Sequence, residues 1–281
     1  MKHLFLNLKR FDISPANGGV NRLASMSGWA ETIVKETQDH LRAYAEDEVQ
    51  FTMYFPEAHL LKAAETKNAG SPIRLGSQSV YRQDTATGGN FGAFTSLRTA
   101  HAVKELGCES TIIGHCEERT AKMSLLAMAG VNSTTAANVT NTVLNAEIKA
   151  AQAAGLTVLY CIGEKSEEQS AWQQVLGDQL DQGLSGVDKT RVVIAYEPVW
   201  SIGPGKTPAD QPYITKIAKF VKERTGGIPV VYGGGLNQNN AKMLAGIDEI
   251  DGGLIALTRF SGEIGFYPEE YLEITKLYLG K

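Results

Sequence analysis

Glu197 is a carboxylate placed where it could act as a general base. It follows the apolar run at residues 192–196, and Pro198 disfavours the helical region for it, so its side chain should project from the end of a strand. Beside apolar Val199 and Trp200 the carboxylate would lose solvation, which raises its pKa toward that of a useful base. The pattern therefore predicts proton abstraction at this position, although a salt-bridged structural glutamate would have the same neighbours.

His115 and Lys9 could supply the polar partners that such a base needs. His115 stands where the run at 110–114 gives way to helix, and the positive end of the helix dipole favours a neutral imidazole that donates to a carbonyl. Lys9 follows Asn7 by two residues, so period-two strand geometry should place both on one face. A lysine at such a mouth implies an anionic ligand, because an unpaired buried charge is costly. Alone, each residue could equally be structural or solvated.

Two glycine-rich segments suggest a lid and a phosphate site. In residues 201–208 glycine and proline alternate between anchored ends, a pattern typical of a hinged lid. The Gly-Lys-Thr at 205–207 is not a phosphate-binding P-loop, because Trp200 stands where that motif needs glycine. The three glycines at 233–235 allow backbone amides to turn toward a phosphate, before a helix that Asn237 could cap.

Eight short apolar runs that end at glycine or polar residues read as strands. They occupy residues 4–8, 49–55, 73–77, 110–114, 156–162, 192–196, 228–232 and 253–257. The segments between them have helical spacing, at residues 28–44, 57–67, 99–106, 141–154, 166–180, 210–224 and 268–279. The longest loop signal, rich in glycine and threonine, covers residues 82–94.

Strand alternating with helix eight times predicts an α/β fold, a (β/α)8 barrel of eight parallel strands surrounded by helices, as a single domain over residues 1–281. An open doubly wound sheet is the alternative, but it would typically carry a GxGxxG fingerprint after an early strand, and none occurs there. In a barrel the reactive residues lie at the C-terminal ends of the strands, which is where the candidates stand.

Composition narrows the class of ligand. The chain is 43% hydrophobic with a formal net charge of −4 and has no lysine- or arginine-rich run, which argues against nucleic-acid and membrane partners. No apolar segment approaches the length of a membrane span, and the N-terminus has the wrong order for a signal peptide. Cys108, Cys116 and Cys161 lack CxxC spacing and read as reduced thiols, so we expect a cytoplasmic protein without a metal site.

Taken together, the motifs resemble the triosephosphate isomerase family, in the family's order and across nearly the whole chain. The matching segments are Asn7-x-Lys9, Gly76-x-Gln78-x-Val80-Tyr81, Gly92-Ala93-Phe94-Thr95, Gly114-His115-x-Glu117, Cys161-Ile162-Gly163-Glu164, Ala195-Tyr196-Glu197-Pro198-Val199-Trp200-x-Ile202-Gly203, Gly205-Lys206-Thr207 and Tyr232-Gly233-Gly234.

The resemblance implies catalytic roles. Glu197 would shuttle a proton between two carbons, His115 would polarise the carbonyl, and Lys9 would stabilise the anionic substrate and enediolate. Glu117 would lie next to Lys9 without contacting the substrate itself. Thr95 would contact a partner subunit, since the family is dimeric. Other substrate-binding residues would be Asn7, Gly203, Gly234, Gly235, Ala256 and Leu257. The implied substrate is a small phosphorylated sugar, and the resemblance implies no cofactor. The implied pathways are glycolysis and gluconeogenesis.

The chain departs from the family pattern near the phosphate and the interface. Gly235 replaces the usual serine after Tyr-Gly-Gly, and Ala256-Leu257 replace paired glycines, with Arg259 as a candidate new cation. Cys116 and Glu118 alter the usual Ser-Glu-Arg, and Leu97 replaces a glutamate. A reversed ion pair between Arg98 and Glu118 is the compensation we expect.

Three functions follow. The first is interconversion of dihydroxyacetone phosphate and D-glyceraldehyde 3-phosphate. The second is the same chemistry on another short sugar phosphate, such as a tetrulose phosphate, favoured by the altered phosphate end. The third is an inactive barrel that binds a phosphorylated metabolite, which the retained base, electrophile and lysine disfavour.

Overall fold

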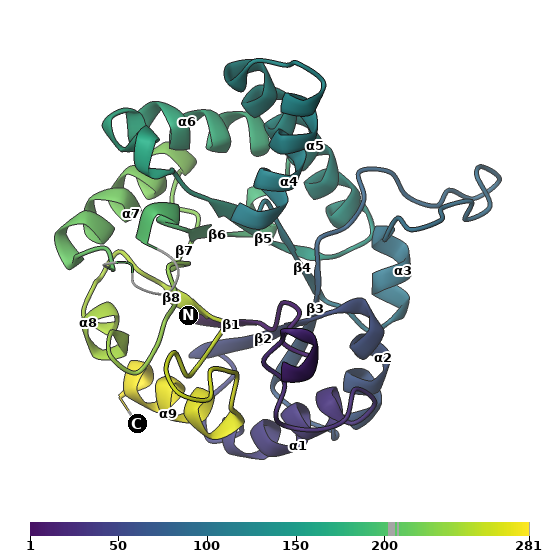
Figure 1. Ribbon diagram of the computed structural model, residues 1–281, viewed down its shortest axis with the longest axis vertical. Coiled ribbons are helices and arrows are strands. Elements are labelled where there is room, and N and C mark those ends of the chain that lie inside the picture. Colours follow the sequence, from purple (N-terminus) through teal and green to yellow (C-terminus); the bar gives the residue numbers. More distant parts are fainter. Residues whose placement is uncertain (202–205, 207, 281) are drawn as a thin grey trace.

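The computed structural model describes residues 1–201, 206 and 208–280, and its centre is a closed barrel of eight parallel strands (Figure 1). Each strand pairs with its neighbour in sequence, and β1 closes the ring by pairing with β8. The strands are β1 (Lys2–Asn7), β2 (Val49–Phe55), β3 (Ile73–Gln78), β4 (Ser110–Ile113), β5 (Thr157–Ile162), β6 (Val192–Tyr196), β7 (Val230–Tyr232) and β8 (Gly252–Ile255). The predicted fold class is confirmed.

Helices form a layer outside the ring (Figure 1). The α-helices are α1 (Trp29–Leu41), α2 (Glu57–Thr66), α3 (Ala100–Glu105), α4 (Cys116–Met128), α5 (Ser133–Ala153), α6 (Trp172–Gly183), α7 (Gln211–Thr225), α8 (Ala241–Ala245) and α9 (Pro268–Leu279). Short 3-10 helices are η1 (Pro15–Asn17), η2 (Ser166–Ala171), η3 (Lys189–Arg191) and η4 (Val199–Ser201). No helix in the described residues is both long and apolar enough to span a bilayer.

The alternation of side chains along each strand builds two cores. In β6, Ala195 points into the barrel and joins the inner cluster, whereas Ile194 and Tyr196 pack outward against the helices. The inner cluster comprises Phe5, Tyr54, Ile112, Leu159, Cys161, Ala195, Val231 and Leu254. Side chains therefore fill the barrel below its mouth, and the C-terminal ends of the strands are where a barrel of this kind places its reactive residues.

The closing seam needs a small residue. His3 pairs with Gly252 and Leu6 with Ile255. A Cβ on Gly252 would lie 1.7 Å from the backbone oxygen of His3, so only glycine lets β8 reach β1 here. A hydrogen bond of 2.7 Å from the Lys2 Nζ to the Ile250 oxygen reinforces the seam.

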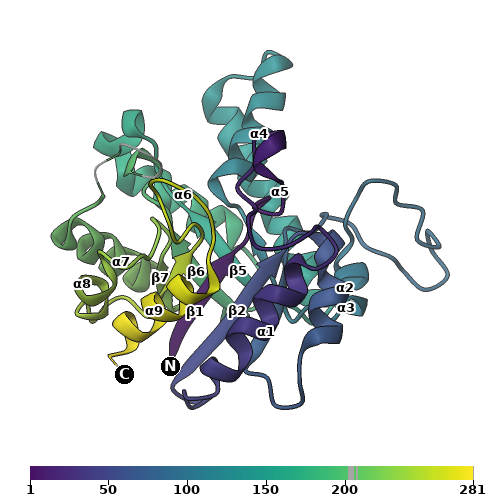
Figure 2. The same cartoon turned by 60° about the horizontal axis from the view of Figure 1, so that its bottom comes forward.

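Helix α4 differs most from expectation. Of the 13 residues of α4, only Arg119 is buried. The helix therefore lacks the broad apolar stripe that identifies a helix in a sequence. Helix α5 begins at Ser133, where Asn132 caps it by accepting a hydrogen bond from the Thr135 amide, eight residues before the expected start at 141. Together α4 and α5 rise beyond the barrel mouth (Figure 2).

Candidate active site

Glu197 follows β6 directly, and its backbone is fixed from the neighbouring strand. Its amide donates to the Ile162 oxygen at 2.7 Å, and a Cβ on Gly163 would lie only 1.9 Å from the Glu197 oxygen. The Glu197 side chain is 2% exposed. Burial raises the pKa of Glu197, opposed by His115 and by the Cys116 amide, and this confirms the expected desolvation. The carboxylate is thus more basic than one in water.

His115 is the N-cap of α4, and its hydrogen bonds define its tautomer. Its Nδ1 accepts from the Glu117 amide at 3.3 Å, so the ring proton belongs on Nε2. That Nε2 lies 3.1 Å from Oε1 of Glu197, while Oε2 of Glu197 accepts from the Cys116 amide at 2.9 Å. A neutral imidazole N–H therefore stands beside the carboxylate, the two partners that proton abstraction next to a carbonyl requires.

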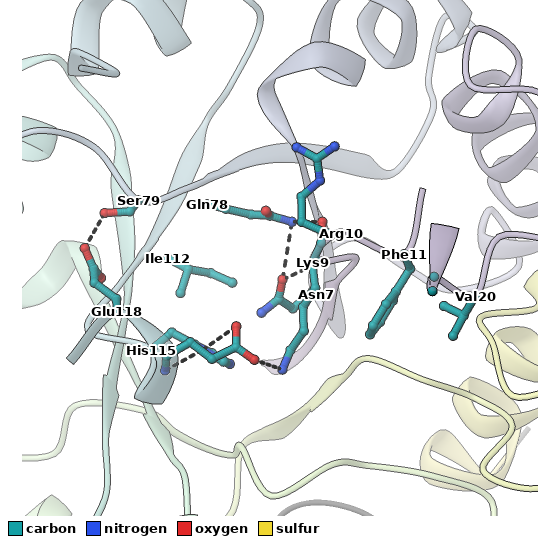
Figure 3. A pocket seen from close by; sticks show the side chains of 13 residues that line it. Asn7, Lys9, Arg10, Phe11, Val20, Gln78, Ser79, Ile112, His115 and Glu118 are labelled. Carbon is teal, nitrogen blue, oxygen red and sulfur yellow. Dashed lines mark hydrogen bonds and ion pairs between the residues drawn. The ribbon is translucent and has the colours of Figure 1, made fainter. Parts of the chain in front are cut away.

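Lys9 reaches the mouth by a turn and not by the strand geometry expected from its spacing. Strand β1 ends at Asn7, and Lys9 adopts a left-handed φ of 43°. The Lys9 amide donates to Oδ1 of Asn7 at 3.1 Å, and the Gln78 side-chain amide donates to the Lys9 oxygen at 3.1 Å. These bonds hold the turn in a conformation unfavourable for lysine. Its Nζ then lies 2.8 Å from Oε1 of Glu117 (Figure 3).

A cavity of about 500 Å³ opens at the barrel mouth, and Asn7, Lys9, His115 and Glu117 are among the residues that line it. Figure 3 draws the Lys9 and His115 side chains at this cavity, and Glu197 lies behind His115 and does not line it. The hydrogen bond from Lys9 lowers the pKa of Glu117 despite the opposing effect of burial. The site therefore contains a paired ammonium that an incoming anion could recruit.

The ends of β7 and β8 present unpaired backbone amides. Within the described chain, the amides of Gly234, Gly235, Ala256 and Leu257 make no hydrogen bond, and these residues are partly exposed. Gly235 has a left-handed φ of 92°, which glycine adopts without strain. Such a set of donors suits a phosphate, as expected, but their binding role stays a prediction. Gly203, the fifth expected donor, lies outside the described residues.

Comparisons with known proteins agree with this geometry. A sequence model of the family "Triosephosphate isomerase" matches residues 24–264. The triosephosphate isomerase of Alkalilimnicola ehrlichii is 32% identical over 233 residues, covering 78% of this chain and 81% of that relative. That of Geobacter metallireducens is 31% identical over 255 residues, covering 86% and 92%. The chain belongs to the triosephosphate isomerase family.

The structure of a triosephosphate isomerase from Bartonella henselae supports the fold. It is 22% identical, has a TM-score of 0.72 and covers 99% of both chains. The family match begins after Asn7 and Lys9, so their assignment depends on the resemblance of the Asn-x-Lys motif and on the contacts above. His115, Glu197 and the β7 and β8 loops fall inside the matched range.

One compensation expected for departures from the triosephosphate isomerase pattern is wrong. Arg98 pairs with Glu57 at 2.9 Å, and Glu118 pairs with Lys122 at 2.7 Å, so no ion pair joins Arg98 to Glu118 in the described chain. The guanidinium of Arg259 lies 2.6 Å from Glu270 and stacks on Tyr267, and its role as a cation for the phosphate stays a prediction.

Glu164 is a second buried carboxylate that our sequence reasoning gave no role. Its Oε1 accepts hydrogen bonds from Tyr196 at 2.9 Å, Trp200 at 2.8 Å and Tyr213 at 3.0 Å. These donors come from β6, from η4 and from α7. Hydrogen bonds to a single oxygen therefore join the elements on both sides of residues 201–208. The Cys161-Ile162-Gly163-Glu164 motif was the available signal, but spacing does not reveal its three partners.

We expect Trp200→Phe to loosen this anchor. The change removes the indole N–H from a buried carboxylate, which should lower the free energy of unfolding by about 1.5 kcal/mol, at the low end because two hydroxyl donors remain. Urea denaturation measures the effect, and kcat/KM should fall as well because Glu197 lies on the same segment. Trp172→Phe is the control, since the Trp172 ring packs on Phe220 without an indole hydrogen bond. Equal losses in both variants would contradict the anchor.

Thr95 stands exposed on the segment between β3 and α3, which projects away from the barrel (Figures 1 and 2). The segment carries Phe91 with 90% of its surface exposed, and Tyr81 packs edge-on against Phe94. The contact of Thr95 with a partner subunit stays a prediction.

Proposed function

We propose that this chain is an aldose–ketose isomerase that interconverts dihydroxyacetone phosphate and D-glyceraldehyde 3-phosphate. The observation that carries the proposal is the pairing of Glu197 Oε1 with His115 Nε2 at 3.1 Å, next to a cavity that also contains the Lys9 ammonium. Membership in the triosephosphate isomerase family supports the same activity. A base, a neutral hydrogen-bond donor and a cation together supply what an enediolate requires.

The proposed reaction follows from the orientation of these groups. The carboxylate of Glu197 takes a proton from the carbon next to the carbonyl, and the Nε2 proton of His115 is donated toward the carbonyl oxygen as negative charge develops there. This pairing of glutamate base and neutral histidine is the established chemistry of the family. The resulting enediolate collapses when the protonated Glu197 returns the proton to the former carbonyl carbon. The hydroxyl proton of the first carbon passes to the former carbonyl oxygen by way of His115 Nε2, so a new carbonyl forms on the first carbon. The Lys9 ammonium offsets the negative charge throughout.

Substrate placement would use the barrel's other strand ends. The unpaired amides at Gly234, Gly235, Ala256 and Leu257 would hold the phosphate, with Asn7 and the lid residue Gly203 completing the site. Glu117 would release Lys9 in part when the anion arrives, because the dianion competes for the same Nζ.

We further propose a cytoplasmic homodimer that acts in glycolysis and gluconeogenesis. Support for the dimer comes from the projecting segment with Thr95, which exposes the Phe91 side chain, and from membership in a family that the resemblance describes as dimeric. The acidic net charge and the cysteine pattern favour the cytoplasm.

A coupled assay with purified protein tests the activity. Glyceraldehyde 3-phosphate should turn over efficiently, and a four-carbon ketose phosphate should turn over more slowly. The reverse order would favour the second candidate, an isomerase of another short sugar phosphate, which the Gly235 and Ala256-Leu257 departures motivate. Binding of an enediolate mimic without turnover of either substrate would identify a metabolite-binding barrel.

The raised pKa of Glu197 predicts the pH profile. The base works only when deprotonated, so kcat/KM should fall as pH drops through its pKa, above the value of about 4.3 for an exposed glutamate. Steady-state kinetics with circular dichroism at each pH separates loss of activity from unfolding. A profile that stays flat down to about pH 4.3 would exclude a buried carboxylate as the base.

A further inference from the structure

Cys116 places a soft ligand beside the catalytic pair. One donor atom each from His115, Cys116 and Glu197 lies within 4.8 Å of the other two. The proposed isomerisation uses the imidazole and the carboxylate but not the thiol. Nitrogen, sulfur and carboxylate oxygen are the three donor types that zinc takes from proteins.

The separations are close to those of a tetrahedral zinc site. Bonds of about 2.1 Å to nitrogen and oxygen and about 2.3 Å to sulfur imply donor separations of about 3.4 to 3.6 Å at the tetrahedral angle. His115 Nε2 and Glu197 Oε1 are 3.1 Å apart, and the widest separation in the cluster is at most 4.8 Å. A rotation of the short Cys116 side chain is a smaller change than rebuilding a loop.

The surroundings already orient two of the ligands. The Cys116 amide holds Oε2 of Glu197 at 2.9 Å, which leaves Oε1 as the oxygen facing the cluster. Outer hydrogen bonds of this kind are what fix carboxylate ligands in metal sites. A thiolate and a carboxylate would also neutralise the two charges of zinc, which suits a partly buried site.

Two cavities each reach one member of the cluster. His115 lines the mouth cavity of about 500 Å³, whereas Cys116 lines a neighbouring one of about 460 Å³ between α4, α5 and α6. Three protein ligands leave a fourth position for solvent, as in open zinc sites.

We propose that His115, Cys116 and Glu197 form a zinc-binding site that inhibits the enzyme by occupying its base and its electrophile. On binding, the Cys116 thiol releases one proton to solvent as the sulfur–zinc bond forms. The imidazole binds through Nε2, whose proton moves to Nδ1, and Nδ1 then no longer accepts from the Glu117 amide. The carboxylate binds without a change of protonation. The ion is an inhibitor and has no part in the isomerisation.

Cobalt(II) is the direct probe of the site, because its binding is seen without turnover. Titrating the purified protein with cobalt should give a thiolate-to-cobalt charge-transfer absorption that saturates at one equivalent. Cys116→Ser should abolish that absorption, and Cys108→Ser, a substitution of a buried thiol elsewhere, should leave it intact. Absence of the band in the native protein, or its survival in Cys116→Ser, would overturn the site.

Zinc inhibition tests whether an ion at this site blocks the proposed activity. Zinc should inhibit competitively with substrate and reversibly by chelator, and Cys116→Ser should raise the inhibition constant by more than about 100-fold, because losing a direct ligand exceeds the 10- to 100-fold effect of losing an outer partner. An unchanged inhibition constant in Cys116→Ser would reject the proposal. If Cys116→Ser does not fold by circular dichroism, Cys116→Ala takes its place. A protein without isomerase activity would still give the cobalt result, so the two proposals fail separately.

Discussion

Glu197→Asp is expected to lower kcat by about 100-fold or more. Shortening the arm by one methylene withdraws the carboxylate by more than 1 Å from the reacting carbon, and a displacement of that size costs about two orders of magnitude. The backbone cannot follow, because Gly163 and the Ile162 oxygen fix it on both sides. Steady-state kinetics with glyceraldehyde 3-phosphate measures the loss.

Glu117→Asp is the matched control for that experiment. It shortens a carboxylate by the same methylene in the same cavity, but the Glu117 side chain is 67% exposed and is not the proposed base. We expect a much smaller effect on kcat in this variant. Turnover of Glu197→Asp within a few-fold of the native enzyme would remove Glu197 from the role of base.

Lys9→Met should lower kcat/KM by at least about 100-fold, with contributions from both constants. Methionine retains much of the apolar stem but removes the ammonium, and loss of one donor to a developing oxyanion costs about two to three orders of magnitude in turnover. The phosphate also loses a cation, so KM should rise. Glu117 would remain without its partner at 2.8 Å.

The control for Lys9→Met is Lys35→Met, which removes an ammonium paired with Glu31 on the surface of α1. Activity of this variant should match the native enzyme, because surface ion pairs contribute little. Equal kinetics for both lysine variants would mean that the Lys9 charge does not reach the substrate.

The barrel could be predicted because the strands are short apolar runs, several of which end at glycine or a polar residue, and every observed strand begins and ends within two residues of its expected bounds. His115 and Glu197 could be placed for the same reason, since each directly follows or nearly follows a strand whose direction is set by the fold. Their 3.1 Å contact also depends on the cap of α4, which spacing does not encode.

Other features depend on contacts between residues distant in sequence. Lys9 enters the site through a left-handed turn that a hydrogen bond from Gln78 of β3 supports. The two-residue spacing from Asn7 predicted the position of Lys9 correctly but attributed it to strand geometry. Arg98 and Glu118 do not pair with each other, because Arg98 pairs with Glu57 and Glu118 pairs with Lys122. The shared oxygen of Glu164 joins three elements, and no local pattern marks such a convergence.

The seam between β1 and β8 links the two ends of the chain's barrel, with the Lys2 side chain bonded to an oxygen 248 residues away. Contacts of such high sequence separation form late, because their loop-closure entropy must be overcome before they contribute. Lys9 follows the strand on one side of this seam, and Ala256, a predicted phosphate-binding residue, follows the strand on the other. During refolding, helical content can therefore return well before enzymatic activity does. The return of activity marks the pairing of β1 with β8, which closes the barrel.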